Sequence, residues 1–251
     1  MTSLETLPAA APAALEDGQL ELTARLTPPA PAPAGLVAWA EPQGVGAEQF
    51  RRLAVSLQHL RARRTLGRVL ITSAAPGEGK SVSAANLALT LARPGTGRVL
   101  LLEGDLHRPK LLARMGVQFS YGLADWLEGR RELRDCLVRW PTLPFWVLPA
   151  ARARALPLEL LQASPPQEIL RQLEPLFDWI VVDAPPLLPM ADAAHWAEAA
   201  DGVLLVVRPG RTRRSDLARA RTQLRADRWL GVILNDCNCR EHHYYGQYYR
   251  D

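Results

Sequence analysis

The chain has 251 residues, of which 48% are hydrophobic and 22% are charged, as in ordinary globular proteins. The longest stretch without Asp, Glu, Lys or Arg covers residues 26–40, which are 15 residues with four prolines. A membrane-spanning helix takes about 20 apolar residues. No basic secretory signal precedes Glu5, and three cysteines are too few for a disulfide framework. We therefore expect a reduced, cytoplasmic protein.

The net charge of +4 is unevenly distributed along the chain. Residues 1–40 hold one arginine and four acids, which leaves +7 for residues 41–251. Such a basic body suits nucleic acid, anionic lipid or a nucleotide, and charge alone does not choose among them. Of the 30 basic residues, only Lys80 and Lys110 are lysines. Because a guanidinium does not replace an ammonium group everywhere, these two positions are candidates for lysine-specific chemistry.

The composition predicts three segments. Residues 1–43 are rich in alanine and proline and are expected to form a flexible leader. Residues 44–236 alternate aliphatic runs with helical patterns, whereas residues 237–251 show neither period and are expected to form a mobile tail. The middle segment is therefore the predicted folded domain.

Within the domain, a helical pattern at residues 48–64 comes first. Buried strands are then predicted at residues 69–72, 99–102, 145–148, 179–182, 203–207 and 230–234. Helices are predicted after the first strand, to about Leu91, and at residues 166–176 and 214–225. Continuous aliphatic strands that alternate with helices predict an α/β fold with a doubly wound, mostly parallel sheet.

A glycine-rich turn between the first predicted strand and its helix carries the clearest chemical motif. The string Ala-Ala-Pro-Gly-Glu-Gly-Lys-Ser ends at Ser81 and matches a P-loop except at Ala74, where glycine is usual. Its backbone N–H groups and the helix N-terminus would bind phosphates. Lys80 would contact the β- and γ-phosphates, and Ser81 would ligate Mg²⁺. The alternative is a turn that binds no ligand.

Acidic residues follow two other predicted strands. Asp183 ends residues 179–182, as a Walker B carboxylate does, and can hold Mg²⁺ directly or through water. Glu103 and Asp105 follow residues 99–102 and can approach the same metal ion or the same attacking hydroxyl. Helix capping or an ion pair is the structural alternative for these carboxylates.

Three motifs in this order resemble those of the bacterial protein-tyrosine kinases of capsule and exopolysaccharide systems, a family within the P-loop NTPases related to ParA and MinD. They are residues 73–81, residues 101–109 and residues 178–186, and the resemblance covers about residues 44–251. It implies a kinase that transfers phosphate from ATP, with Mg²⁺, to its own tyrosines, with possible ATPase activity. The implied catalytic residues are Lys80, Glu103, Asp105 and Asp183.

The resemblance also implies further roles. The implied ligands of Mg²⁺ are Ser81, Asp105 and Asp183. The residue implied to lie near the base of the nucleotide is Asn235. The full nucleotide site is Gly77, Glu78, Gly79, Lys80, Ser81, Val82 and Asn235. The acceptors are the tail tyrosines, four of five in the chain: Tyr244, Tyr245, Tyr248 and Tyr249. A ring-forming helix would use Glu48 and Arg51, although Ala54 replaces the usual third residue and His107 replaces an arginine in the second motif.

The family context predicts partners as well. We expect homo-oligomers, a transmembrane regulator of polysaccharide chain length that recruits the chain to the inner face of the membrane, and an opposing tyrosine phosphatase. No nucleic-acid partner is expected.

Two other functions remain open at this point. One is a P-loop regulator of the same export machinery without kinase activity. The other is a ParA/MinD-type positioning ATPase, although that class needs a second lysine where this chain has Ala75. The tail also contains Cys237, Cys239, His242 and His243, a possible but unfavoured zinc set.

Overall fold

The computed structural model describes residues 17–93, 95 and 97–237. Within these residues the chain forms one eight-stranded sheet in the order β1-β4-β5-β3-β6-β2-β7-β8. The strands are β1 (Ala24–Arg25), β2 (Arg68–Ser73), β3 (Val99–Glu103), β4 (Val138–Arg139), β5 (Phe145–Leu148), β6 (Trp179–Asp183), β7 (Gly202–Val207) and β8 (Trp229–Leu234).

Neighbouring strands are parallel except for β4 with β5, which pair antiparallel. Each predicted strand is present, and the prediction of a doubly wound, mostly parallel sheet is confirmed. In the five central strands from β5 to β7, almost every residue is buried, because helices cover both faces and no face meets water.

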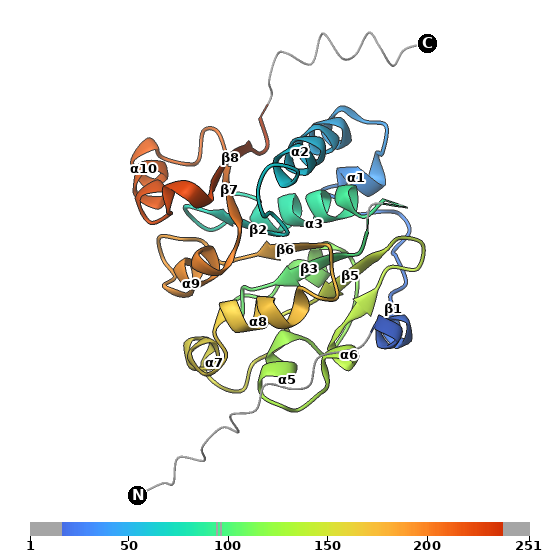
Figure 1. The fold of residues 1–251 in the computed structure, drawn as a ribbon. Coiled ribbons are helices and arrows are strands. Elements are labelled where there is room, and N and C mark those ends of the chain that lie inside the picture. The colour runs from blue at the N-terminus through green and yellow to red at the C-terminus, as the bar shows by residue number, and fades with distance from the viewer. Residues whose placement is uncertain (1–16, 94, 96, 238–251) are drawn as a thin grey trace, which may run out of the picture.

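The helices lie on both sides of this sheet (Figure 1). They are α1 (Val37–Ala40), α2 (Val45–Arg61), α3 (Lys80–Leu91), α4 (Leu111–Arg114), α5 (Leu123–Leu127), α6 (Leu133–Cys136), α7 (Pro157–Ala163), α8 (Pro166–Leu173), α9 (Asp192–Ala199) and α10 (Arg214–Thr222), with 3-10 turns at Asp17–Leu22 and Ala226–Arg228. Among the described residues, no helix combines the length and apolarity that crossing a bilayer requires.

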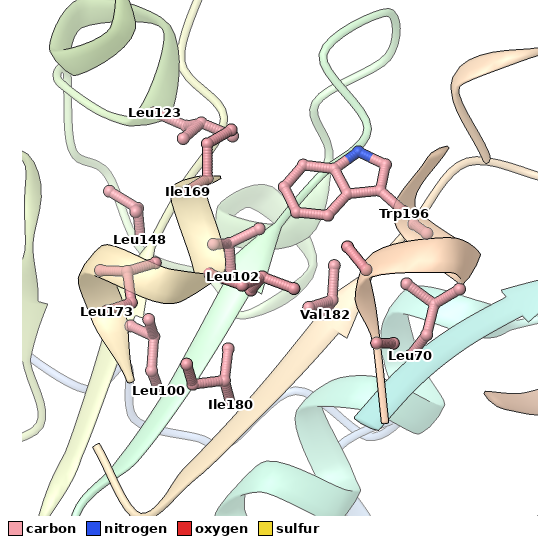
Figure 2. Close-up of a cluster of buried hydrophobic side chains, with 14 of the residues drawn as sticks. Leu70, Leu100, Leu102, Leu123, Leu148, Ile169, Leu173, Ile180, Val182 and Trp196 are labelled. Carbon is pink, nitrogen blue, oxygen red and sulfur yellow. The ribbon is translucent and has the colours of Figure 1, made fainter. Parts of the chain in front are cut away.

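Each face of the sheet has its own hydrophobic core. Leu100 and Ile180 point to one face, where α8 and α9 supply Leu173 and Trp196 (Figure 2). Their strand neighbours point to the other face and pack against α2 and α3. This alternation follows from the two-residue period of a strand. The packing of α3 against the sheet also fixes the phosphate loop, because α3 begins at Lys80.

Residues 17–43 differ from the flexible leader that composition predicts. Leu20, Leu26 and Leu36 are almost fully buried, and β1 adds to the edge of the sheet beside β4. The Asn86 side chain of α3 accepts a hydrogen bond from Ala38 N and donates one to Gly35 O, both at 2.9 Å. A few leucines and one buried amide therefore order a segment whose average composition is that of a linker.

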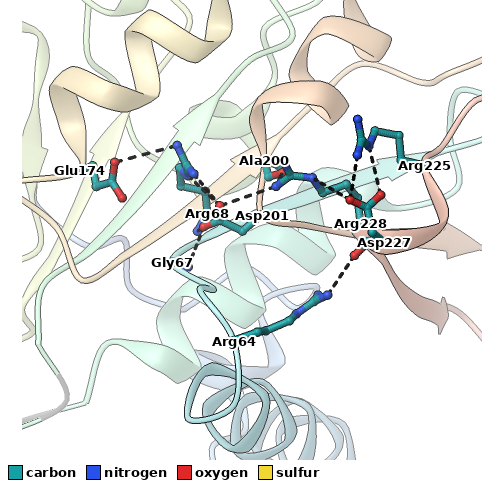
Figure 3. A network of polar contacts seen from close by, with 9 residues as sticks. All are labelled: Arg64, Gly67, Arg68, Glu174, Ala200, Asp201, Arg225, Asp227 and Arg228. Atoms are coloured by element: carbon teal, nitrogen blue, oxygen red, sulfur yellow. Dashed lines mark hydrogen bonds and ion pairs between the residues drawn. The ribbon is translucent and has the colours of Figure 1, made fainter.

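A polar network joins the amino-terminal ends of β2 and β7, opposite the edge that carries the phosphate loop (Figure 3). Asp201 accepts hydrogen bonds from the Arg68 guanidinium and from the backbone N–H groups of Gly67 and Arg68. Burial raises the pKa of Asp201, but these donors outweigh it and hold the pKa below its usual value. The network stabilises the amino-terminal ends of β2 and β7, and the phosphate loop lies at the carboxyl end of β2.

Candidate active site

The phosphate loop connects β2 to α3 and depends on two glycines. Gly77 and Gly79 have φ values of +84° and +99°, a backbone conformation that favours glycine. A Cβ at position 79 would also lie 1.9 Å from Nδ2 of Asn235. Glycine is therefore required at position 79 both by the backbone turn and by the close approach of Asn235.

Lys80, the first residue of α3, pairs with two acidic residues. Its Nζ lies 3.0 Å from Oδ2 of Asp105 and 3.5 Å from Oδ1 of Asp183. These carboxylates approach one another because β3 and β6 are neighbours and both end here. Burial disfavours the ammonium form, but the two negative charges outweigh it and raise the pKa of Lys80. The lysine remains charged at neutral pH.

Asp183 is a buried carboxylate with the Lys80 ammonium as its neighbouring cation. Its side chain is 1% exposed, and neither carboxylate oxygen has a hydrogen-bond partner in normal geometry. Burial raises its pKa, against the opposing effect of the Lys80 charge. Ser81 and Asp105 line the adjoining cavity. With the buried carboxylate of Asp183, the oxygens of Ser81 and Asp105 make three hard ligands that suit Mg²⁺, so the residues present fit that ion.

Glu103 is positioned differently from the catalytic role that its spacing suggested. Its Oε1 accepts hydrogen bonds from the backbone N–H groups of Lys110, at 2.6 Å, and Leu111, at 2.7 Å. Its Oε2 accepts a third from Ala150 N at 3.0 Å. Both oxygens are thus engaged by the main chain, and Glu103 joins the loop after β3 to α4 and to the end of β5.

Asp105 is the acid of this pair that faces the phosphate loop. Its second oxygen accepts a hydrogen bond from Arg108 N at 3.1 Å. The residue before it, Gly104, packs against the buried Trp196 ring. His107 adds a 2.8 Å contact from Nε2 to Asp192 at the start of α9. The loop that carries Asp105 is therefore held from several elements.

The other predicted nucleotide residues divide into two groups. Glu78 is buried and braces the loop itself, because its carboxylate accepts hydrogen bonds from Ala75 N and the Thr212 hydroxyl. Asn235 donates to Glu78 O at 3.0 Å and, with Val82, lines a mostly apolar cavity of about 320 Å³. That cavity adjoins the phosphate loop and offers an apolar surface for a nucleoside.

The phosphate-loop cavity itself has a volume of about 380 Å³. It brings together the predicted residues Gly77, Gly79, Lys80, Ser81 and Asp105. It also contains cations that sequence reasoning did not assign, namely Arg108, Lys110, Arg114 and Arg211. For Arg211, the high density of arginines in residues 208–214 is a sequence signal for an anion site. The same pattern also fits a solvated loop.

Curated relatives identify the family. The chain is 31% identical over 215 residues to the tyrosine-protein kinase YwqD of Bacillus subtilis, covering 85% of this chain and 90% of YwqD. This chain belongs to the bacterial tyrosine-protein kinases. The kinase is also 32% identical over 227 residues to the succinoglycan biosynthesis transport protein ExoP of Rhizobium meliloti, covering 83% of the kinase but only 29% of ExoP. No protein-family model matches it.

Solved structures agree with this assignment. The kinase domain of the Escherichia coli tyrosine kinase ETK matches this kinase with a TM-score of 0.71 and 27% identity. The match covers 80% of this chain and 79% of that domain. The resemblance inferred from the three motifs is therefore confirmed, and so is the P-loop fold.

Of the remaining predicted residues, the structure describes Glu48 and Arg51, which do not line the phosphate-loop cavity. Glu48 and Arg51, expected at a ring interface, pair with each other within α2, and Arg51 also donates to the Pro42 carbonyl. The acceptor tyrosines lie outside the described residues: Tyr244, Tyr245, Tyr248 and Tyr249. So does the suggested zinc set except for Cys237, and the described residues contain no cluster that would hold a metal ion.

Proposed function

We propose that this chain is an ATP-dependent tyrosine kinase that phosphorylates its own tail and regulates polysaccharide synthesis or export. The observation that carries the proposal is the grouping of Lys80, Asp105 and Asp183 at the carboxyl ends of adjacent strands. The name of ExoP, which refers to succinoglycan biosynthesis and transport, supports the polysaccharide context.

The chemistry follows from the positions of these groups. The phosphate-loop amides and Lys80 bind the triphosphate, so Lys80 exchanges Asp105 for phosphate oxygens. Asp105 is then released from Lys80, and its carboxylate can accept the proton of a tyrosine hydroxyl. The bond from the γ-phosphorus to the β-phosphate oxygen breaks, a bond to the tyrosine oxygen forms, and ADP leaves. Mg²⁺, held by Ser81, Asp105 and Asp183, would neutralise phosphate charge.

The remaining contacts position the nucleotide and the loops. Val82 and Asn235 would contact the nucleoside in the adjoining cavity, while Glu78 and Glu103 hold the two loops in place. In this proposal Glu103 is a positioning residue, since its oxygens already accept three backbone hydrogen bonds.

The proposed partners extend this function to the cell. We propose a cytoplasmic kinase that assembles with copies of itself through α2, is recruited by a transmembrane adaptor and is opposed by a phosphatase. The match to ExoP, a transport protein of which it covers 29%, supports an association of this kinase with transport components.

The experiment that tests the function uses the purified full chain, γ-labelled ATP and Mg²⁺. Label should appear on tyrosine in residues 237–251 and should be absent when Tyr244, Tyr245, Tyr248 and Tyr249 are all replaced by Phe. Retention of the label in that variant would show that the tail is not the acceptor. ATP hydrolysis without any protein labelling would instead support the regulator without kinase activity.

A further inference from the structure

The mouth of the phosphate-loop cavity is lined by more cationic side chains than the one lysine that the proposed phosphate transfer uses. Besides Lys80, the lining contains Arg108, Lys110, Arg114 and Arg211, and its acidic member is Asp105. Lys80 is already compensated by Asp105 and Asp183. The other four cations are exposed at the cavity wall. The mouth therefore has a strong positive field that is not compensated by the contacts of Lys80 with Asp105 and Asp183.

These cations lie on two different sides. Arg211 belongs to the phosphate-loop side, because its Nη2 lies 3.0 Å from the position of a Cβ on Gly77. Arg108, Lys110 and Arg114 belong to the loop after β3 and to α4, on the side of Asp105. We therefore assign Arg211 to the nucleotide and the other three cations to whatever approaches Asp105.

The backbone that carries these three cations is held in place. Arg108 N donates to Asp105 and Lys110 N donates to Glu103, at 3.1 Å and 2.6 Å. In contrast, the charged heads of Arg108, Lys110 and Arg114 form no hydrogen bond or ion pair with any other residue that the structure describes. Fixed backbone and uncompensated charge make this side of the cavity suitable for an anion.

The tail sequence indicates which anion would reach this place. Its tyrosines occur as adjacent pairs, 244–245 and 248–249, so one transfer leaves a phosphate beside an unmodified tyrosine. A phosphotyrosine carries about −1.5 to −2 charge at neutral pH and three acceptor oxygens. The unmodified tail offers little charge of its own, because Arg240 and Arg250 offset Glu241 and Asp251.

We propose that Arg108, Lys110 and Arg114 form a second anion site, which binds the phosphotyrosine of a tail already phosphorylated once. The tail belongs to a second copy of this chain, and the neighbouring tyrosine then lies at Asp105. This proposal rests on the proposed kinase function and adds an order to it: each phosphorylation favours the next. It also gives Lys110, the second of two lysines in the chain, a role in phosphate recognition.

A pair of peptides of residues 240–251 tests the proposal by kinetics. Both keep Tyr249 as the acceptor and carry Tyr244→Phe and Tyr245→Phe; Tyr248 is phosphorylated in one and replaced, Tyr248→Phe, in the other. We expect kcat/KM to be about tenfold higher for the phosphopeptide, since charge-assisted contacts strengthen its binding. In the variant Arg108→Gln/Lys110→Gln/Arg114→Gln, the ratio of the two values should fall to about one.

A matched control removes the same charge elsewhere. Arg213, Arg214 and Arg219 are exposed and do not line the cavity, so their triple replacement by Gln should keep the tenfold ratio. Equal kcat/KM values in the native chain, or a ratio that survives in the cavity variant, would overturn the proposal.

A binding measurement separates this proposal from the kinase function. With ADP and Mg²⁺ present, fluorescence anisotropy should show the labelled phosphopeptide binding about tenfold more weakly to the cavity variant than to the native chain or the matched control. Selective binding without any transfer would support the anion site and contradict the kinase proposal. Equal binding to all three proteins would contradict the anion site whatever the transfer rates.

Discussion

The ammonium group of Lys80 lies 3.0 Å from the carboxylate of Asp105, so the proposed phosphate ligand and the proposed base neutralise each other before nucleotide binds. A triphosphate that takes Lys80 leaves Asp105 free to accept a proton. In the proposed mechanism, this exchange would couple nucleotide binding to activation of the acceptor.

The first prediction separates these two residues. Asp105→Asn should bind ATP within a few-fold of the native chain but transfer phosphate at least about 100-fold more slowly, because an amide is not a base. Lys80→Met should lose both tight nucleotide binding and transfer. Nucleotide titration and single-turnover labelling measure the two effects. Equal loss of binding in both variants would show that Asp105 acts in binding alone.

A second prediction concerns Glu103 as a positioning residue. Glu103→Ala leaves three backbone donors without their acceptor and should lower the free energy of unfolding by about 2–3 kcal/mol. Glu103→Gln retains an acceptor oxygen and should lose less stability and keep measurable transfer. Urea unfolding and labelling test both variants. If Glu103→Gln were fully stable and as inactive as Asp105→Asn, Glu103 would be a catalytic acid.

The third prediction is a pH dependence of stability from Asp201. Its pKa is lowered on folding, so the unfolded chain binds the proton more readily and the stabilisation is present above pH 3.8. Asp201→Asn should cost about 2–3 kcal/mol at pH 7, since charged hydrogen bonds to Arg68 and the backbone are lost. This cost should shrink as pH falls below about 3.8. Urea unfolding at a series of pH values checks the sign, and a constant difference would contradict it.

The fourth prediction tests whether residues 17–43 belong to the folded domain. Leu36 is 1% exposed, so Leu36→Ala should lower the free energy of unfolding by about 2–4 kcal/mol. Leu22 is 75% exposed, and Leu22→Ala should change it by less than about 0.5 kcal/mol. Two equally stable variants would restore the interpretation of this segment as a leader.

Local sequence predicted the phosphate loop and the buried strands. Residues 77–81 carry the glycines that the turn needs, and Asp183 follows an aliphatic run, so both are readable without tertiary contacts. Composition predicts a flexible leader over residues 1–43, whereas the structure buries Leu20, Leu26 and Leu36. Average composition does not predict this burial, because the residues that pack against these three leucines lie far along the chain.

The second acidic motif shows where sequence reasoning ends. Glu103 and Asp105 are two residues apart, and the motif alone allowed both to act on metal or hydroxyl. Only the tertiary structure distinguishes them. The Glu103 carboxylate accepts hydrogen bonds from amides at the start of α4 and just after β5, whereas Asp105, past the end of β3, contacts Lys80.

The lysine count is a similar case. Sequence alone predicted phosphate chemistry at Lys80, because a P-loop requires an ammonium group at that position. Lys110 lies outside the three sequence motifs, so the sequence predicted no specific role for it. Its place beside Arg108 and Arg114 at the cavity mouth exists only because α4 folds back beside the end of β3, which brings separate charges to one side of Asp105.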